Sequence, residues 1–291
     1  MTRVALIGTG GMGQGMARKL LETGFDLVVC NRSPAKAQPL VDAGAALAFT
    51  AREAAAGADF VVAMVGNDDD SREVWLGTDG VLAGGPNPGA IAIESSTLSF
   101  GWVRELAETL TAAGLRFVDC PVTGGRQAAE SGTLTLLVGA SDQDLIAARP
   151  VLEAYSQKIV HFGAPGAGTA YKLAVNLLVG VQAAALGEIL VLANSAGLPM
   201  EQVVQCLASS PAASPIVQAY AARMVNGEHG EPIQFLERWM HKDMVYGVRL
   251  AADMGQAAPT CAIAAQVHQM AMSRGMGDRN VTAVIEALRQ P

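Results

Sequence analysis

Length, charge and composition exclude several classes of protein. The chain has 291 residues, a formal net charge of −7 and 51% hydrophobic residues. This length is typical of one large or two ordinary domains, and the apolar content excludes a disordered chain. The 20 basic residues form no run that could follow a phosphate backbone, so we expect no nucleic-acid partner.

Nothing in the chain predicts a membrane partner or export. The most apolar stretch, residues 173–200, is interrupted by Asn176, Gln182, Glu188 and Asn194, whereas a spanning helix needs about 20 nearly uninterrupted apolar residues. The amino end has an apolar run of only four residues before a glycine, which is too short for a secretory signal. We therefore expect a cytoplasmic protein.

The cysteines and acidic residues predict no metal site. Cysteines occur at positions 30, 120, 206 and 261, without a CxxC pair or a histidine at metal-ligand spacing. We expect them to be reduced packing residues. The three consecutive aspartates at 68–70 are expected to form a solvated loop or a helix start, with a metal role as the alternative.

Short apolar runs separated by helical patterns fill the first half of the chain. Most runs are continuous rather than alternating, which is typical of a sheet covered on both faces. Helices are expected between the runs, for example at 13–23 and 99–113, and strands at 4–7, 27–30, 60–65, 91–93, 117–120, 134–138 and 159–162. This order predicts a parallel α/β sheet.

The pattern changes after His161. A glycine-rich segment, 163–168, precedes a helical pattern about 28 residues long, and the later segments also predict helices, at 200–207, 216–224, 241–254, 257–274 and 281–288. We therefore expect an α/β domain over 1–163 and an all-α domain over 164–291, joined by the long helix.

The segment Gly8-Thr9-Gly10-Gly11-Met12-Gly13 follows the first strand, opens a helix and matches GxGxxG. In this context the first glycine permits a tight turn, the second lets a pyrophosphate approach, and the third allows close helix–strand packing. The N–H groups of the helix start suit a diphosphate. The sequence predicts a Rossmann-type dinucleotide-binding domain with these six residues at the cofactor; a glycine turn without a ligand is the alternative.

The end of the second strand indicates which dinucleotide binds. An NAD site normally has Asp or Glu about 20 residues past the turn, but no carboxylate lies between residues 27 and 41. Arg32 and Lys36 could instead meet a 2′-phosphate, with Asn31 and Ser33 as neutral donors. We expect NADP as the preferred cofactor, with NAD possible if these charges are only solvated.

The long helix carries a candidate proton donor. Lys172 is the only Lys, Arg, Asp or Glu between residues 158 and 188, and Asn176 lies four residues later, on the same helix face. A lysine on so apolar a segment is costly to bury unless its ammonium finds partners, and such a lysine can act as a general acid. Snorkelling to water is the alternative. The four histidines are weaker candidates and are expected to be structural.

Two further segments follow strand ends, where ligands bind in open α/β sheets. Thr123, Gly124 and Gly125 offer a hydroxyl and backbone N–H groups suited to a carboxylate, although an ordinary glycine turn is the alternative. The hydroxyls of residues 95–97 could line the nicotinamide or the substrate. We expect the glycines at 8, 10, 13, 124, 125 and 168 to face ligands.

Several motifs, in order along essentially the whole chain, resemble the β-hydroxyacid dehydrogenase family. They are GTGGMGQGMARKLLETG from residue 8, SST at 95–97, DCPVTGGRQAAESGTLTLLVGA from 119, GAGTAYKLAVN from 166, KDM at 242–244 and GMGDRNVTAVIEAL near the end. The resemblance implies an NAD(P)-dependent oxidoreductase with a 6-phosphogluconate dehydrogenase-like C-terminal domain. Its substrates would be a small carboxylate-bearing aldehyde and the corresponding β-hydroxyacid.

The resemblance also implies a role for individual residues. Lys172 falls on the general acid/base and Asn176 on a substrate-orienting residue, while Thr123, Gly124 and Gly125 hold the substrate carboxylate. The residues expected to contact the cofactor are Val65, Thr97 and Lys242. Those expected to contact the substrate are Phe235, Trp239 and Asp243.

The departures from the family pattern concern the substrate more than the chemistry. Residues 31–33 with Lys36 resemble the NADP-preferring branch that includes glyoxylate/succinic semialdehyde reductases. Thr123 stands where serine is usual, and residues 238–241 match no known substrate set. An NAD-dependent 3-hydroxyisobutyrate-type dehydrogenase is an alternative, as is an imine-reducing side activity, although imine reductases usually carry another residue, often Asp or Tyr, at the position of Lys172. A non-catalytic NADP-binding protein is disfavoured because Lys172, Asn176 and Thr123 occur together.

The long helix also indicates self-association. Gly180, Ala183, Ala184 and Gly187 are small residues that permit close helix packing. We expect a homodimer or homotetramer through the helical domain, which the resemblance also implies.

Overall fold

The computed structural model describes residues 1–289, and contacts within the chain divide it into two units. The first unit is Met1–Lys172, and the second begins at Leu173. The boundary expected near residue 163 coincides with the end of the last strand, β9 (Ser156–Gly163). Helix α9 (Ala167–Ser195) begins after it, in the first unit, and continues into the second.

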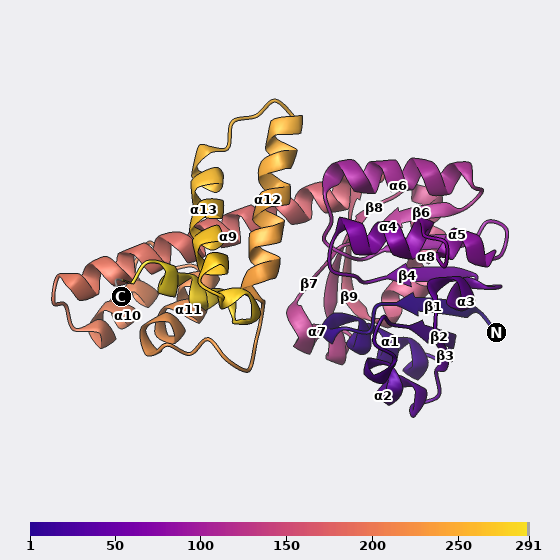
Figure 1. The fold of residues 1–291 in the computed structure, drawn as a ribbon, viewed down its shortest axis with the longest axis horizontal. Coiled ribbons are helices and arrows are strands. Elements are labelled where there is room, and N and C mark those ends of the chain that lie inside the picture. Colours follow the sequence, from indigo (N-terminus) through magenta and orange to yellow (C-terminus); the bar gives the residue numbers. More distant parts are fainter. Residues whose placement is uncertain (290–291) are drawn as a thin grey trace. The chain divides into compact units, whose positions relative to one another are not determined.

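The first unit is a sheet with helices on both faces (Figure 1). Its strands are β1 (Arg3–Ile7), β2 (Asp26–Cys30), β3 (Ala46–Ala48), β4 (Phe60–Ala63), β5 (Ile91–Glu94), β6 (Arg116–Asp119), β7 (Val122–Thr123), β8 (Leu134–Gly139) and β9. Its helices before α9 are α1 (Gly11–Glu22), the 3₁₀ helix η1 (Pro34–Lys36), α2 (Gln38–Val41), α3 (Ala51–Ala55), α4 (Asp68–Leu76), α5 (Val81–Gly84), α6 (Phe100–Ala112), α7 (Gly125–Ser131) and α8 (Asp142–Ala154).

The strands follow the order β3-β2-β1-β4-β5-β6-β8-β7, and β9 pairs with β8. The first six are parallel, in the order of a doubly wound dinucleotide-binding sheet. The predicted parallel order holds for these six strands, and the sheet departs from it at one edge, where β8 is antiparallel to β6 and β7. Only residues 124–133 connect β7 to β8, and such a short connection suits antiparallel strands, whereas a parallel crossover needs about a dozen residues or more.

The sequence of strand β1 is continuously apolar because both of its faces are buried. Val4 and Leu6 belong to the core under α1 and α8, whereas Ala5 and Ile7 belong to the core under α3 and α6. Successive side chains point to opposite faces of a strand, so both faces must be apolar when both are covered. The prediction of a sheet covered on both faces is confirmed.

The described part of the second unit is helical. After α9 it contains α10 (Met200–Ser209), α11 (Pro215–Asn226), α12 (Glu237–Asp253), α13 (Pro259–Ser273), and the 3₁₀ helices η2 (Met276–Asp278) and η3 (Val281–Ala287). The helix expected at 281–288 therefore winds as 3₁₀ rather than α. It is a short segment tied at its start, where Val281 N–H donates to the Phe235 carbonyl at 2.8 Å, and 3₁₀ winding is frequent in short connectors.

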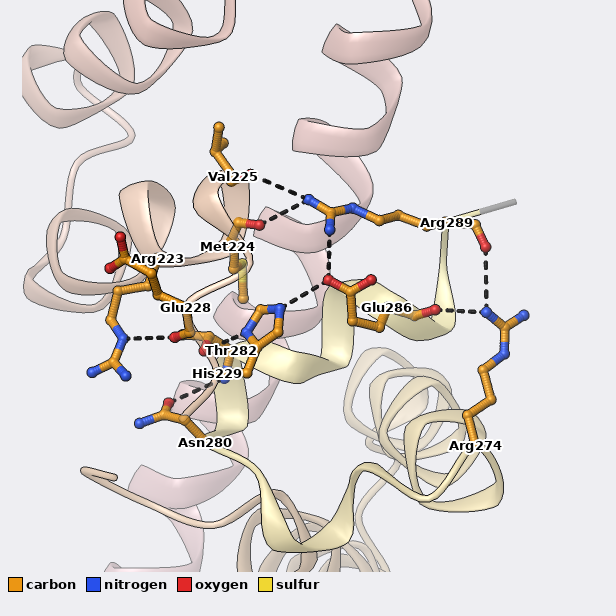
Figure 2. A network of polar contacts seen from close by, with 10 residues as sticks. All are labelled: Arg223, Met224, Val225, Glu228, His229, Arg274, Asn280, Thr282, Glu286 and Arg289. Carbon is orange, nitrogen blue, oxygen red and sulfur yellow. Dashed lines mark hydrogen bonds and ion pairs between the residues drawn. The ribbon is translucent and has the colours of Figure 1, made fainter. Parts of the chain in front are cut away.

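A polar network holds this last segment against the rest of the second unit (Figure 2). His229 Nδ1 lies 3.0 Å from Thr282 Oγ1, and His229 Nε2 lies 2.8 Å from Glu286 Oε1. Arg289 donates to the same carboxylate at 2.6 Å, and Arg274 donates to the Glu286 carbonyl at 2.6 Å. His229 thus has the structural role expected of it.

The small residues of α9 pack inside the second unit. A Cβ at Gly180 would lie 2.1 Å from Met244 Sδ, and a Cβ at Gly187 would lie 3.0 Å from Leu288 Cδ1. Ala183 and Ala184 are buried in the same core. We expected these positions to serve an interface between copies, but they let α12 and the C-terminal segment approach α9 instead.

Among the described residues one helix, α9, could cross a membrane as judged by length and composition alone. Its most apolar window has a mean hydropathy of 1.9, and 39% of that window is buried. A long helix in the core of a two-unit protein meets the same criterion, and α9 carries Lys172, Asn176 and Glu188. This is weak evidence for a membrane span, and the absence of a membrane partner stays a prediction.

Candidate functional site

The glycine-rich turn connects β1 to α1 beside β4, where the strand order reverses. Gly8 has φ 98°, and a Cβ there would lie 2.2 Å from the Met64 carbonyl oxygen, so this position requires glycine. A Cβ at Gly13 would lie 1.9 Å from the Gly8 oxygen, whereas nothing lies within 4 Å of a Cβ at Gly10. The first and third glycines thus allow close packing, and the second leaves open space for a ligand.

Asn31 connects the end of β2 to this turn. Its Oδ1 accepts the Thr9 N–H at 2.9 Å, and its Nδ2 donates to the Ser33 carbonyl at 3.0 Å. We expected Asn31 to be a neutral donor to a 2′-phosphate and Thr9 to face the cofactor. In the structure Asn31 Oδ1 and one Nδ2 hydrogen are used within the protein, and Oδ1 satisfies the backbone N–H of Thr9, which is fully buried. A contact of Asn31 with a 2′-phosphate stays a prediction.

The cationic residues expected beside a 2′-phosphate are exposed. Arg32 is 90% exposed and pairs with Asp70 of α4 at 3.3 Å, while Ser33 and Lys36 are exposed next to it. An exposed ion pair contributes little free energy. Arg32 can therefore exchange Asp70 for a phosphate, with which it forms stronger bidentate hydrogen bonds.

Glu94, to which the sequence interpretation gave no role, organises the ends of β4 and β5. It is fully buried, and its carboxylate accepts hydrogen bonds from Ser71 Oγ at 2.8 Å, Trp75 Nε1 at 2.7 Å and Ser96 N at 2.9 Å. Burial raises the pKa of Glu94, and these donors lower it. Ser96 Oγ in turn accepts the N–H of Val65 at 2.8 Å, so Glu94 fixes the segments that contain Val65 and Thr97.

Asp119, at the end of β6, holds the start of α9. Its Oδ2 accepts the N–H groups of Gly166 at 3.1 Å and Thr169 at 2.9 Å, and its Oδ1 accepts the Thr169 hydroxyl at 2.6 Å. Burial raises the pKa of Asp119 to about 7, although these hydrogen bonds lower it. Lys172 lies less than one helical turn after Thr169, so Asp119 fixes the part of α9 that carries Lys172.

Two glycines allow this contact. A Cβ at Gly168 would lie 2.1 Å from the Leu137 carbonyl oxygen, and a Cβ at Gly139 would lie 2.9 Å from Asp119 Oδ2. The close approach of Gly168 to strand β8 explains the glycine at this position, and its contact with a ligand stays a prediction. Lys172 itself is half-buried.

Thr123, Gly124 and Gly125 form the turn between β7 and α7. Gly124 has φ 129° and Gly125 has φ 74°, conformations that favour glycine. Thr123 and Gly124 are exposed, and Gly125 is half-buried. The turn therefore presents a hydroxyl and backbone N–H groups that could hold a carboxylate.

The predicted site residues of the second unit form a separate polar cluster. Asn176 Nδ2 donates to Asp243 Oδ2 at 2.6 Å, and Lys242 Nζ lies 3.0 Å from Asp243 Oδ1. The Lys242 ammonium also lies 5.9 Å from the centre of the Trp239 ring, and Phe235 packs against the unit's core. The amide of Asn176, which is buried, is thus oriented by Asp243.

The first unit fits a dinucleotide and shows no competing metal site. Open space at Gly10, close packing at Gly8 and Gly13, and the exposed Arg32 suit a diphosphate and an adenine ribose. Across residues 1–289, no three His, Cys, Asp or Glu side chains are grouped to hold a metal ion. The four cysteines are free.

Comparisons with known proteins match both halves of the chain. Residues 3–163 match the NAD binding domain of 6-phosphogluconate dehydrogenase, and residues 166–288 match the NAD-binding domain of NADP-dependent 3-hydroxyisobutyrate dehydrogenase. The 2-(hydroxymethyl)glutarate dehydrogenase of Eubacterium barkeri is 30% identical over 99% of this chain and 95% of its own. The chloroplastic glyoxylate/succinic semialdehyde reductase 2 of Arabidopsis thaliana is 28% identical over 98% of this chain and 79% of its own. The 3-hydroxyisobutyrate dehydrogenase of Mycobacterium tuberculosis, solved with L-serine, has a TM-score of 0.88 at 30% identity, with both chains fully covered.

The fold, the glycine-rich turn and these matches define an NAD(P)-binding oxidoreductase. The chain belongs to the 3-hydroxyisobutyrate dehydrogenase-like β-hydroxyacid dehydrogenase family. The predictions of family, fold class and enzyme class are confirmed.

Proposed function

We propose that this protein is a cytoplasmic, NADP-dependent enzyme that interconverts a small carboxylate-bearing aldehyde and the corresponding β-hydroxyacid. The observation that carries the proposal is the fixing of α9 by Asp119, because it holds the segment with Lys172 against the strand that leads to the Thr123–Gly125 turn. A proton donor and a carboxylate-binding turn are what the reduction of such an aldehyde requires.

The preference for NADP is supported by the end of β2. No carboxylate is present between residues 27 and 41, and Arg32 and Lys36 are both exposed there. A guanidinium pairs bidentately with a phosphate group, whereas an NAD site would place a carboxylate on the ribose hydroxyls. The ratio of the dissociation constants of NADPH and NADH measures this preference, and equal constants would leave NAD as an equivalent cofactor.

A dinucleotide held by the glycine-rich turn would supply the hydride for reduction and would accept it in oxidation. In reduction, Lys172 donates a proton from Nζ to the carbonyl oxygen, and in oxidation it removes the proton of the hydroxyl group. The Thr123 hydroxyl and the N–H groups of Gly124 and Gly125 hold the substrate carboxylate. Asn176 is proposed to orient the substrate through the amide that Asp243 fixes.

The test is Lys172→Ala, assayed with glyoxylate, succinic semialdehyde, tartronate semialdehyde and 3-hydroxyisobutyrate, each with both cofactors. Since general acid catalysis contributes about 10²- to 10⁴-fold, we expect kcat to fall by that factor while the Kd of NADPH changes less than about twofold. Lys158→Ala, an exposed lysine of β9, is the matched control. Wild-type rates for Lys172→Ala on every accepted substrate would show that another group transfers the proton. Tight NADPH binding by the wild-type protein without any turnover would instead favour a non-catalytic role.

A further inference from the structure

Arg126 lies over the first residue of helix α1. A Cβ built on Gly11 would fall 2.4 Å from Arg126 Nε and 3.0 Å from its Cζ. Gly11 belongs to the glycine-rich turn and opens α1. Arg126 follows the Thr123–Gly125 turn directly, as the second residue of α7. The guanidinium group therefore lies at the point where the predicted cofactor turn and the predicted substrate turn meet.

The position of Arg126 is set by close packing between α7 and α1, which lie side by side (Figure 1). A Cβ at Gly15 of α1 would lie 2.6 Å from the carbonyl carbon of Ala129, so the two helices touch through their backbones. Gly15 and Ala129 are both buried. Arg126 lies less than one helical turn before Ala129, so the contact between the two helices fixes its backbone position. A ligand would have to fix only the torsions of its side chain.

The electrostatic surroundings favour an anion at this point. In the part of the chain that the structure describes, Arg126 has no ion pair, whereas Arg116 pairs with Asp144 and Arg149 with Glu153. Neither α1 nor α7 has an acidic residue in its first turn. The first N–H groups of α1 have no partner within the helix, so these donors and the guanidinium can share one anion.

We propose that Arg126 binds the pyrophosphate of the dinucleotide, together with the N–H groups at the start of α1. The inference rests on the proposed function for the presence of a dinucleotide and adds a ligand from outside the GxGxxG segment. A guanidinium forms paired, charge-assisted hydrogen bonds to phosphate oxygens. NADP and NAD share the pyrophosphate, so Arg126 strengthens the binding of both, whereas Arg32 is proposed to distinguish them.

The experiment measures the Kd of NADPH, NADH and adenosine 2′-monophosphate for the full-length protein by isothermal titration calorimetry. The last ligand carries the 2′-phosphate but no pyrophosphate. Arg126→Gln should raise the Kd of NADPH and of NADH by a similar factor, roughly 10- to 100-fold, and leave the Kd of adenosine 2′-monophosphate unchanged. Arg32→Gln should instead raise the Kd of NADPH and of adenosine 2′-monophosphate and leave the Kd of NADH unchanged.

Two further variants separate a direct contact from a general loss of charge. Arg18→Gln removes another exposed arginine, two turns further along α1, and should leave all three constants within about twofold. Gly11→Ala places a methyl group where the flexible Arg126 side chain lies, so it should weaken both dinucleotides. In the Arg126→Gln background the same methyl group should have little further effect, because the side chain that it displaces is gone.

Three results would overturn the inference. Unchanged dinucleotide constants in Arg126→Gln would show that the guanidinium does not bind the cofactor. A raised Kd for NADPH and adenosine 2′-monophosphate but not for NADH would assign Arg126 to the 2′-phosphate. A raised KM for the aldehyde with unchanged dissociation constants for the dinucleotides would assign it to the substrate. If the wild-type protein binds no dinucleotide, it is the proposed function that fails.

Discussion

At Asp119 two opposing effects act on one carboxyl group. Complete burial disfavours the charged form, while the N–H groups of Gly166 and Thr169 and the Thr169 hydroxyl favour it. The result is a pKa of about 7, which means that Asp119 changes its charge near neutral pH. Because these contacts hold the start of α9, the ionisation of one residue is linked to the stability of the helix that carries Lys172.

We expect Asp119 to make stability depend on pH in a defined direction. Its pKa in the folded protein lies above the ordinary value of 3.8, so the folded state binds the proton more tightly than the unfolded state. The stabilisation is therefore fully present below about pH 4 and is lost as the pH rises through about 7. Asp119→Asn lacks this titration. The free energy of unfolding of the wild-type protein relative to this variant should fall between about pH 5 and pH 8, by up to about 3 kcal/mol.

Urea unfolding of both proteins across this pH range provides the measurement. In the variant an amide NH₂ replaces one acceptor oxygen, which adds an offset that is the same at every pH, so the slope and not the offset tests the argument. A difference that is constant with pH would show that Asp119 does not titrate in this range.

At the scale of the element, α9 depends on a narrow space beside strand β8. Gly168 lies on the Leu137 carbonyl oxygen, and Gly139 leaves room for Asp119 and for the backbone of Ala164. A side chain at either position would push the first turn of α9 away from the sheet, because the atoms that it meets include backbone atoms. The close contact is a property of packing and not of helix propensity.

Gly168→Ala is therefore expected to destabilise the protein even though alanine is the better helix former. The new Cβ would lie 2.1 Å from the Leu137 oxygen, and overpacking of this kind typically costs about 1–3 kcal/mol. We expect a lower urea midpoint together with a reduced kcat, since the turn before Lys172 is displaced.

Gly101→Ala is the matched control in helix α6, where nothing lies within 4 Å of the added Cβ. This variant should keep full activity, and its free energy of unfolding should rise by up to about 1 kcal/mol, as expected for glycine replaced by alanine in a helix. Equal stabilities for the two variants would show that the close approach at Gly168 is unimportant.

At the scale of the whole molecule, α9 leaves one apolar face uncovered in the second unit. Leu178, Ile189 and Leu192 are 61%, 48% and 65% exposed, and Ala185 lies on the same face. Exposed apolar faces of this kind often mark contacts with another protein. Since Gly180 and Gly187 are used inside the unit, we propose that this other face of α9 joins two copies of the chain.

Sedimentation equilibrium tests the proposed self-association. We expect the wild-type protein to have at least twice the chain mass of 30.0 kDa and Leu178→Glu with Leu192→Glu to shift it toward the monomer, because a carboxylate is costly to bury at an interface. Ile146→Glu changes an equally exposed apolar residue of α8 in the first unit and should leave the mass unchanged. A monomeric wild-type protein would contradict the proposal.

The sequence by itself determined the features that repeat at short range. Continuous apolar runs identified the strands of a doubly covered sheet, and the spacing of Gly8, Gly10 and Gly13 identified the dinucleotide turn, because both depend on neighbours within a few residues. The antiparallel edge was not predictable in the same way, since β7 has only two residues and its pairing depends on the path of the chain.

Only the tertiary structure decided which side chains support the site. Glu94 accepts hydrogen bonds from Ser71 and Trp75, and Asp119 accepts hydrogen bonds from Thr169, fifty residues later in the chain. Arg126 lies over Gly11 although its helix, α7, comes much later in the sequence. For the same reason, only the folded structure shows the hydrogen bonds of Asn31 to Thr9 and Ser33 and the close packing of Gly168 on strand β8. Burial and the need to pair buried polar groups act between segments that the fold brings together. The spacing of residues along the chain does not predict which of these segments lie close together in space.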